Sequence, residues 1–172
     1  MPNYNVYMCQ GITIADLRGN MLLTGAGNDA DALQSCSAIV FVNTATWAAG
    51  LYHFPEGDID SDADSQLRIG RLATRVMPNE VYIGYGTLGP VDDFGNARNG
   101  ASVINGEKLT AFVRRLFPQT RVRRMPATGG VVTVTSNAGA TVIGHHVPNP
   151  WVDLRNDAEG DHGAYRTYGH AR

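Results

Sequence analysis

This 172-residue sequence has little cysteine, no excess of charge of one sign and no long apolar run. Its two cysteines, Cys9 and Cys36, are too few for a disulfide scaffold, and a chain of this length can bury a core without one. We expect unbridged buried thiols, with a single bridge as the alternative. The 14 Lys and Arg residues nearly balance the 16 Asp and Glu residues, so the formal net charge of −2 provides no global attraction to nucleic acid or to an anionic membrane.

Targeting and membrane-spanning segments are also lacking. No stretch approaches the roughly 20 apolar residues of a transmembrane helix, and Met1-Pro2-Asn3-Tyr4 has neither the basic nor the apolar part of a signal peptide. We therefore expect a protein that is cytoplasmic, or secreted without a Sec signal. With 43% hydrophobic and 17% charged residues, residues 1–172 predict a single globular domain, and we expect a monomer.

Short apolar or alternating runs, bounded by Gly, Asn and Pro, predict that much of the chain forms strands. The run from Ser35 to Val42 is apolar at both parities, which is typical of a central strand covered on both faces. A similar run, Trp47 to Phe54, follows after Asn43-Thr44-Ala45-Thr46, and a hairpin is the simplest connection. The other predicted strands are Asn5–Cys9, Ile12–Ala15, Met21–Thr24, Glu80–Gly84, Thr120–Met125, Val131–Ser136 and Ala140–His145.

Two segments have the apolar spacing of helices. The first extends from Ser61 to Met77, after Asp and Ser residues that cap helices well, and the second from an Asn105 cap to Phe117. Residues 86–100 predict a long loop, and the polar tail, residues 147–172, has no period. The sequence therefore predicts an α+β fold, with two helices packed against a mostly antiparallel β-sheet system.

The spacing of Cys36 and His53 indicates a chemical role. A hairpin symmetric about Thr44-Ala45 pairs positions whose numbers sum to 89, which places Cys36 directly opposite His53. Opposed side chains have Cβ atoms about 4.5 to 5.5 Å apart, and an imidazole at that distance can take the proton of a thiol. The pair would be a nucleophile with its base. The alternative is a small core cysteine and a strand-end histidine, because one β-bulge would move His53 to the other face.

The order of elements around this pair resembles the chemoreceptor glutamine deamidase family, with its CheD-like fold, which includes catalytic domains of toxins such as cytotoxic necrotising factor. The resemblance covers about residues 21–145. It rests on Leu33-Gln34-Ser35-Cys36 entering an apolar strand, on Leu51-Tyr52-His53 in the hairpin return, and on the later helices, strands and Thr128-Gly129-Gly130 turn. It implies a β-sandwich with two helices. The chain has Ala30 where chemoreceptor deamidases carry threonine, and Thr24 could take that place.

The resemblance implies a cysteine-dependent protein glutamine deamidase from bacteria, either an effector or toxin or a chemoreceptor-type enzyme. Its substrate would be a protein bearing a reactive glutamine. Cys36 would be the nucleophile, His53 the acid and base, and Thr24 or a backbone carbonyl would orient the imidazole. Backbone amides near Ser35 and Cys36 would hold the oxyanion. The reaction needs no metal and no cofactor, and we expect neither nucleic acid nor a membrane as a partner.

Other motifs favour structural roles. Residues 84–89 match G-x-G-x-x-G, but Pro90 follows where a dinucleotide-binding helix would begin. Counted as a calcium loop from Asp58, the acidic run has Ala63 and Ile69 where Gly and Glu are needed, so we expect helix caps. The remaining candidates are scattered histidines and a basic cluster. For the histidines a metal site competes with solvated side chains, which we favour because neighbours on a strand point to opposite faces. For the basic cluster a solvated edge competes with a docking surface for an acidic protein or nucleic acid. These candidates are His145, His146, His162 and His170, and Arg114, Arg115, Arg121, Arg123 and Arg124.

Two readings compete with the deamidase. One is a non-catalytic protein-interaction module of the same fold that uses the basic cluster or the 86–100 loop. The other is a different cysteine reaction on this fold, such as transamidation, which incorporation of an added amine would reveal. Rapid alkylation of Cys36 near neutral pH separates an activated thiol from a core cysteine.

Overall fold

The strands form two five-stranded sheets in the computed structural model, which describes residues 3–6, 10–24, 33, 36–54, 57–85, 101–126, 131–137, 139–143 and 152–153. The first sheet has the order β10-β1-β3-β8-β9 and the second the order β2-β5-β4-β6-β7. β1 is parallel to β10 and β3, β6 is parallel to β7, and the other pairs are antiparallel. The strands are β1 (Asn3–Val6), β2 (Gly11–Ile14), β3 (Met21–Thr24), β4 (Ser37–Val42), β5 (Ala49–Phe54), β6 (Glu80–Tyr85), β7 (Arg121–Pro126), β8 (Val131–Thr135), β9 (Gly139–Ile143) and β10 (Val152–Asp153).

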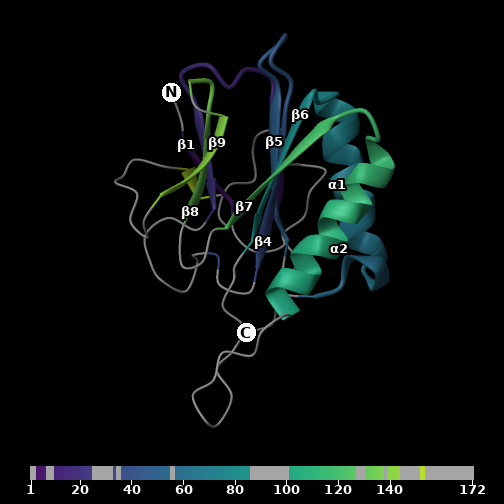
Figure 1. Cartoon of the computed structure of the whole chain (residues 1–172). Helices are drawn as coiled ribbons and strands as arrows, with labels where there is room; N and C mark the ends of the chain where they lie inside the picture. The colour runs from purple at the N-terminus through teal and green to yellow at the C-terminus, as the bar shows by residue number, and fades with distance from the viewer. Residues whose placement is uncertain are drawn as a thin grey trace, which may run out of the picture.

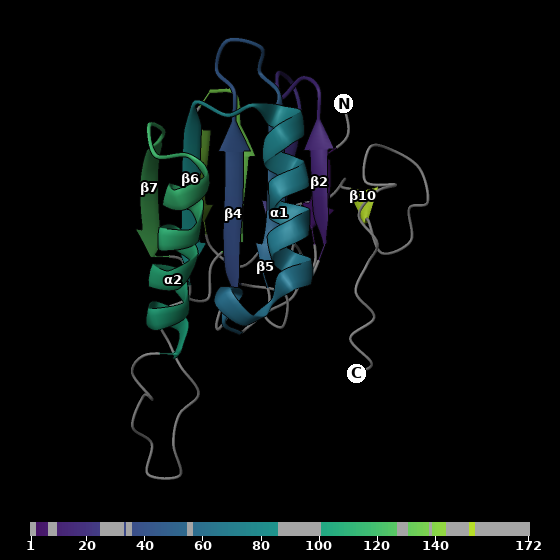
Figure 2. The same ribbon diagram turned by 90° about the vertical axis from the view of Figure 1, so that its right-hand side faces the viewer.

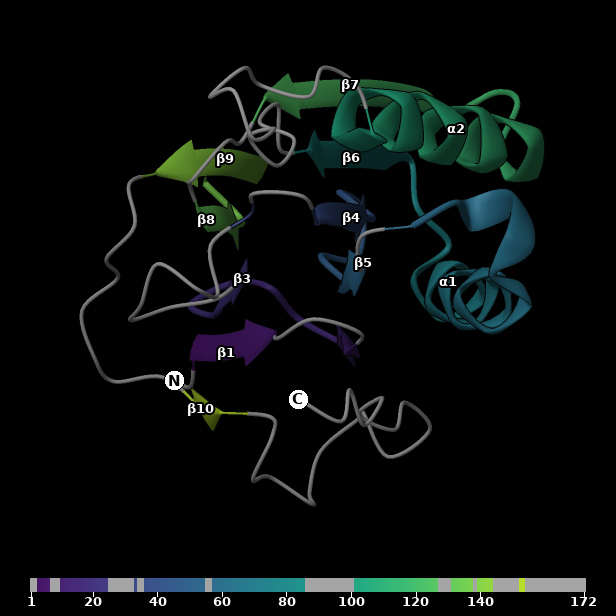
Figure 3. The same cartoon turned by 90° about the horizontal axis from the view of Figure 1, so that it is seen from below.

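Two α-helices, α1 (Ala63–Val76) and α2 (Ala101–Leu116), and a short 3-10 helix, η1 (Ile59–Ser61), complete the described elements. The helices cover one face of the second sheet, and the first sheet lies against its other face, so that three layers result (Figures 1, 2 and 3). The prediction of an α+β fold with two helices is confirmed. No helix in the described part of the chain is long and apolar enough to cross a membrane.

The protein has two hydrophobic cores, one between the two sheets and one between the second sheet and the helices. Strand β4 contributes side chains to both, as its continuous apolar run predicts. Ala38 and Val40 face the first sheet, where they pack with Val6, Leu22 and Val132. The intervening Ile39 and Phe41 face the helices and pack with side chains such as Leu72 and Val113. Successive side chains of a strand point to opposite faces, so β4 is buried over its whole length.

The second helix begins earlier than the sequence predicts. It starts at Ala101, so Asn105 lies inside α2 and is not its cap. Asn105 and Gly106 are weak helix formers, which is why propensity alone places the boundary there. Gly106 allows α2 to lie close to β6, since a Cβ at this position would come within 3.2 Å of the Tyr85 side chain. Tertiary packing therefore overrides the local preference.

Gly84 allows the two sheets to approach each other. It pairs with Ala38 in β4, and a Cβ added to it would lie 2.6 Å from Cγ2 of Val132 in the other sheet. We expect Gly84→Ala to lower the free energy of unfolding by about 1 to 3 kcal/mol, because overpacking forces a rigid buried side chain to shift. Urea unfolding measures this effect.

The matched control for Gly84→Ala is Gly70→Ala in α1, where an added Cβ meets nothing within 4 Å. This change should raise the free energy of unfolding by up to about 1 kcal/mol, because alanine is the better helix former. An equal free energy of unfolding in Gly84→Ala and Gly70→Ala would contradict the close approach of the two sheets at Gly84 and Val132.

Candidate functional site

The β4–β5 hairpin sets the relation between Cys36 and His53. Its pairs extend from Val42↔Ala49 to Ser37↔Phe54 and include Ala38↔His53, so the position numbers sum to 91 and not to 89. The prediction that Cys36 lies directly opposite His53 is wrong by two positions, because the residue opposite His53 is Ala38. The turn is longer than assumed: the Asn43 amide donates to the Ala48 carbonyl, and the Asn43 side chain accepts from the amides of Ala45 and Thr46. This asparagine turn moves the centre of the hairpin by one residue.

The observed register keeps the two residues on one face. Cys36 immediately precedes β4 and packs against the core between the two sheets, which is the core that includes Ala38. His53 pairs with Ala38, so it is a diagonal neighbour of Cys36 instead of its direct partner. Diagonal neighbours in a sheet lie about 7 to 8 Å apart, within reach of an aromatic ring. Cys36 is half-buried and not in a disulfide.

The imidazole of His53 is fixed by the opposite sheet. His53 is only 2% exposed, and its Nδ1 lies 3.0 Å from the carbonyl oxygen of Val6 in β1. Because a carbonyl can only accept, Nδ1 carries the proton and donates it, which leaves a lone pair on Nε2. That buried Nε2 has no hydrogen-bond partner among the described residues, so no hydrogen bond joins it to the Cys36 thiol. The ring is thus held in the tautomer that a general base requires.

Burial lowers the pKa of His53 to about 4, although the hydrogen bond to the Val6 carbonyl raises it in part. The imidazole is therefore neutral at physiological pH and can accept a proton at Nε2. A thiolate formed beside it would raise the pKa of the imidazole, because a nearby negative charge favours the protonated ring. The imidazole of the site is therefore neutral at rest.

No hydrogen bond joins Thr24 to the imidazole of His53. It is fully buried at the end of β3, where its Oγ1 accepts a hydrogen bond of 3.0 Å from the Val132 amide. Its register partner in β1 is Val6, the residue whose carbonyl holds the imidazole. The sequence analysis named Thr24 or a backbone carbonyl as the group that orients the imidazole. Among the described residues that group is a backbone carbonyl, the carbonyl of Val6. No sequence signal could have identified Val6, because every residue carries a carbonyl.

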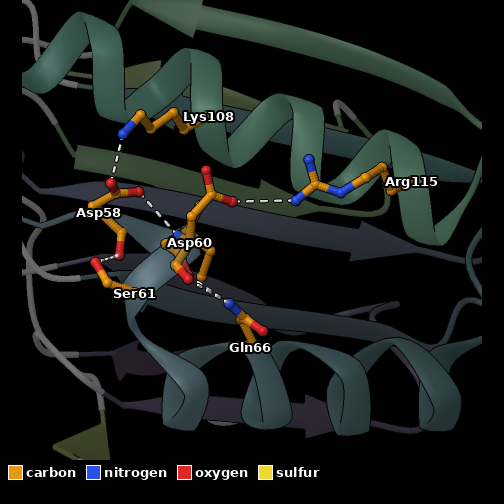
Figure 4. A network of polar contacts seen from close by, with 7 residues as sticks. Asp58, Asp60, Ser61, Gln66, Lys108 and Arg115 are labelled. Atoms are coloured by element: carbon orange, nitrogen blue, oxygen red, sulfur yellow. Dashed lines mark hydrogen bonds and ion pairs between the residues drawn. The ribbon is translucent and has the colours of Figure 1, made fainter.

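The acidic run that imitates a calcium loop forms helix caps, as predicted. Asp58 accepts from the Asp60 amide at the start of η1, and Asp62 accepts from the Ser65 amide at the start of α1. Figure 4 shows that the same segment ties the helices together: Lys108 of α2 donates to Asp58 over 2.5 Å, and Arg115 pairs with Asp60 at 3.2 Å. The bond from Lys108 holds the pKa of Asp58 below its ordinary value. Among the residues described, no group of three or more His, Cys, Asp or Glu is arranged to hold a metal ion.

Several predicted features lie outside the described residues. They are Cys9, Ser35 with its oxyanion role, the 86–100 loop with most of the G-x-G-x-x-G match, the Thr128-Gly129-Gly130 turn, and the histidines at 145, 146, 162 and 170. A hollow of about 570 Å³ on α1 is lined by Gln66, Leu67, Gly70, Arg71, Thr74 and Arg75. It includes neither Cys36 nor His53, so it is separate from the candidate site.

No protein-family model matches the chain, and a search among curated proteins finds no match either.

Proposed function

We propose that the protein is a cysteine-dependent protein glutamine deamidase with a CheD-like β-sandwich fold. The observation that carries the proposal is the state of His53: its Nδ1 is fixed by the Val6 carbonyl, and its unbonded Nε2 lies on the sheet face where Cys36 packs. A buried histidine whose only role is packing would be expected to satisfy both ring nitrogens. A neutral imidazole with an unbonded lone pair, on the sheet face where a thiol packs, instead suits nucleophilic catalysis by cysteine.

The proposed reaction converts a glutamine side chain of a protein substrate to glutamate. His53 Nε2 takes the Cys36 proton, the thiolate attacks the amide carbon, and the imidazolium returns the proton to the departing ammonia. Water then attacks the thioester, with His53 again as the base, and releases the carboxylate and the thiol. Backbone amides near Ser35 and Cys36 would stabilise the oxyanion, and the reaction consumes water only.

The substrate is not specified by these groups. We propose a bacterial enzyme that acts as a monomer on a protein glutamine, in the cytoplasm or as an effector or toxin secreted without a Sec signal. A chemoreceptor-type substrate is the alternative within the family. Neither a metal nor another cofactor has a part in the proposed chemistry.

Alkylation kinetics test whether His53 activates Cys36. At neutral pH, iodoacetamide should label Cys36 at least about tenfold faster in the wild type than in His53→Gln, because the neutral imidazole can take the thiol proton as the sulfur attacks and glutamine cannot. Glutamine can still donate to the Val6 carbonyl, so this variant preserves the anchoring bond. Peptide mass spectrometry follows Cys36 separately from Cys9. Equal rates in the two proteins would contradict the proposed pair.

One observation favours a non-catalytic interaction module of the same fold. The Cys36 thiol and the His53 ring are not hydrogen-bonded, while exposed arginines gather on the edge strand β7. A wild-type protein that released no ammonia from any partner tested, and whose Cys36 reacted no faster than in His53→Gln, would favour this second function.

A further inference from the structure

Strand β7 carries three exposed arginines, Arg121, Arg123 and Arg124, which we name the arginine edge. β7 is the last strand of the second sheet, and among the described strands it pairs only with β6. Figure 2 shows β7 at the margin of the sheet, beyond β6. One side of its backbone thus has no strand partner in the described part of the chain, and such an edge offers amides and carbonyls to an added strand.

The arginine edge presents guanidinium groups to both faces of the sheet. Arg123 lies over the ring of Tyr82, at 5.7 Å, and Tyr82 belongs to the core between the sheets. Arg124 lies over the ring of Tyr85, at 5.1 Å, and Tyr85 contacts Gly106 in α2 on the other face. Arg121 shares the face of Arg123, because side chains alternate along a strand.

None of these three arginines forms an ion pair with a described carboxylate. The nearest acidic residue in register with Arg121 is Glu80, whose Oε2 accepts the Tyr82 hydroxyl at 2.5 Å. Arg115, which belongs to the same basic stretch of sequence, is different, because it pairs with Asp60. Within the basic cluster predicted from the sequence, Arg115 of α2 therefore has a structural partner, whereas the charge of the arginine edge on β7 is available to a ligand.

The presence of arginine instead of lysine on β7 favours binding of a ligand over a role limited to protecting the strand edge against aggregation. Edge strands are commonly protected against aggregation by charged residues, lysine in particular. Of the 14 basic residues in this chain, Lys108 is the only lysine. Arginine stacks on aromatic rings and offers a planar fork that binds a carboxylate with two hydrogen bonds. The two tyrosine rings hold Arg123 and Arg124 in place, which lowers the conformational entropy lost on binding a ligand.

We propose that the arginine edge docks an extended acidic segment of a partner protein, which adds as a strand beside β7. In an added strand, side chains also alternate between the faces, so consecutive Asp or Glu residues would meet Arg121 and Arg123 on one face and Arg124 on the other. Backbone hydrogen bonds would supply affinity, and the arginines would select acidic sequences. This docking does not depend on the chemistry of Cys36.

An acidic protein segment fits this surface better than nucleic acid does. The whole chain has a net charge of −2, whereas nucleic-acid-binding domains are usually strongly basic. The rings of Tyr82 and Tyr85 are covered by guanidinium groups, so they are not available for the stacking with bases that single-stranded nucleic acids use. Nucleic acid also cannot form the regular hydrogen bonds that a strand edge offers.

The test measures fluorescence anisotropy of a labelled peptide, rich in Glu and of strand length, about eight residues, with the full-length protein. The probes for comparison are the same peptide with N-methylated backbone amides at alternate positions, a Lys-for-Glu peptide and a single-stranded DNA of equal charge. We expect the acidic peptide to bind, N-methylation on the pairing side to weaken it at least tenfold, and the other two probes to bind more weakly than the acidic peptide.

Two sets of variants make the test specific. Replacing Arg121, Arg123 and Arg124 together by Gln should weaken peptide binding at least tenfold, and replacing them by Lys should weaken it less, because charge remains without the planar fork. The matched control, Arg18→Gln, Arg71→Gln and Arg75→Gln, removes equal charge elsewhere and should change affinity less than twofold. Circular dichroism verifies that each variant is folded. Unchanged affinity in the Gln variant, tight binding of the N-methylated peptide, or tighter binding of the DNA would each overturn the proposal.

Discussion

Cys36→Ser should lower the rate of glutamine deamidation at least about a thousandfold, because a serine hydroxyl is far harder to ionise than a thiol. His53→Gln should cause a loss of similar size. Glutamine keeps a donor for the Val6 carbonyl but provides no base for the thiol and no acid for the departing ammonia. The assay follows ammonia release together with a mass increase of about one dalton in the partner protein, as an amide nitrogen is replaced by oxygen.

The choice of substitution at His53 follows from its burial. His53 is 2% exposed between the sheets, so alanine would leave a cavity and an unsatisfied Val6 carbonyl, and lost activity would then be difficult to separate from lost stability. Thr24→Val serves as a comparison, because Thr24 bonds to the Val132 amide and not to the imidazole. We expect it to lower activity far less than His53→Gln. Normal turnover in Cys36→Ser would exclude Cys36 as the nucleophile.

The sequence predicts elements well where one local pattern determines them. The apolar runs give β4 and β5 within two residues of their observed starts, and the run Met21–Thr24 is observed as β3 without change. The helical spacing and the acidic caps likewise predict α1, which begins two residues after the expected Ser61. Each of these signals comes from residues that are neighbours in the chain, so no knowledge of the tertiary structure is needed.

The geometry of the candidate site could not be predicted from such local signals. The Cys36–His53 relation depends on a turn whose centre is set by the hydrogen bonds of the Asn43 side chain. The assumption of a hairpin symmetric about Thr44-Ala45 places His53 opposite Cys36, two positions from its observed partner, Ala38. Cys36 and His53 are still expected on the same face of the sheet, because a shift of two positions along a strand does not change the face to which a side chain points. The bond from His53 to Val6 crosses 47 positions of sequence and uses a backbone atom, so no residue pattern predicts it.

Lowering the pH should destabilise the folded protein through His53. Its folded pKa is about 4, whereas an imidazole in the unfolded chain has its ordinary pKa of 6.5. Above pH 6.5 the ring is neutral in both states, so the histidine has no effect on how stability varies with pH. As the pH falls from 6.5 towards 4, the unfolded state binds the proton more readily than the folded state, and the free energy of unfolding decreases.

The expected loss is about 2 kcal/mol by pH 5 and about 3 kcal/mol in full below pH 4, from the difference between the two pKa values. Urea unfolding at pH 7 and pH 5 measures it, and His53→Gln is the control, because glutamine does not titrate. The wild type should lose about 2 kcal/mol more than the variant between these pH values, since other groups contribute equally to both proteins. Equal losses would mean that His53 is solvated and protonates readily, and the buried base with its unbonded Nε2 would then be excluded.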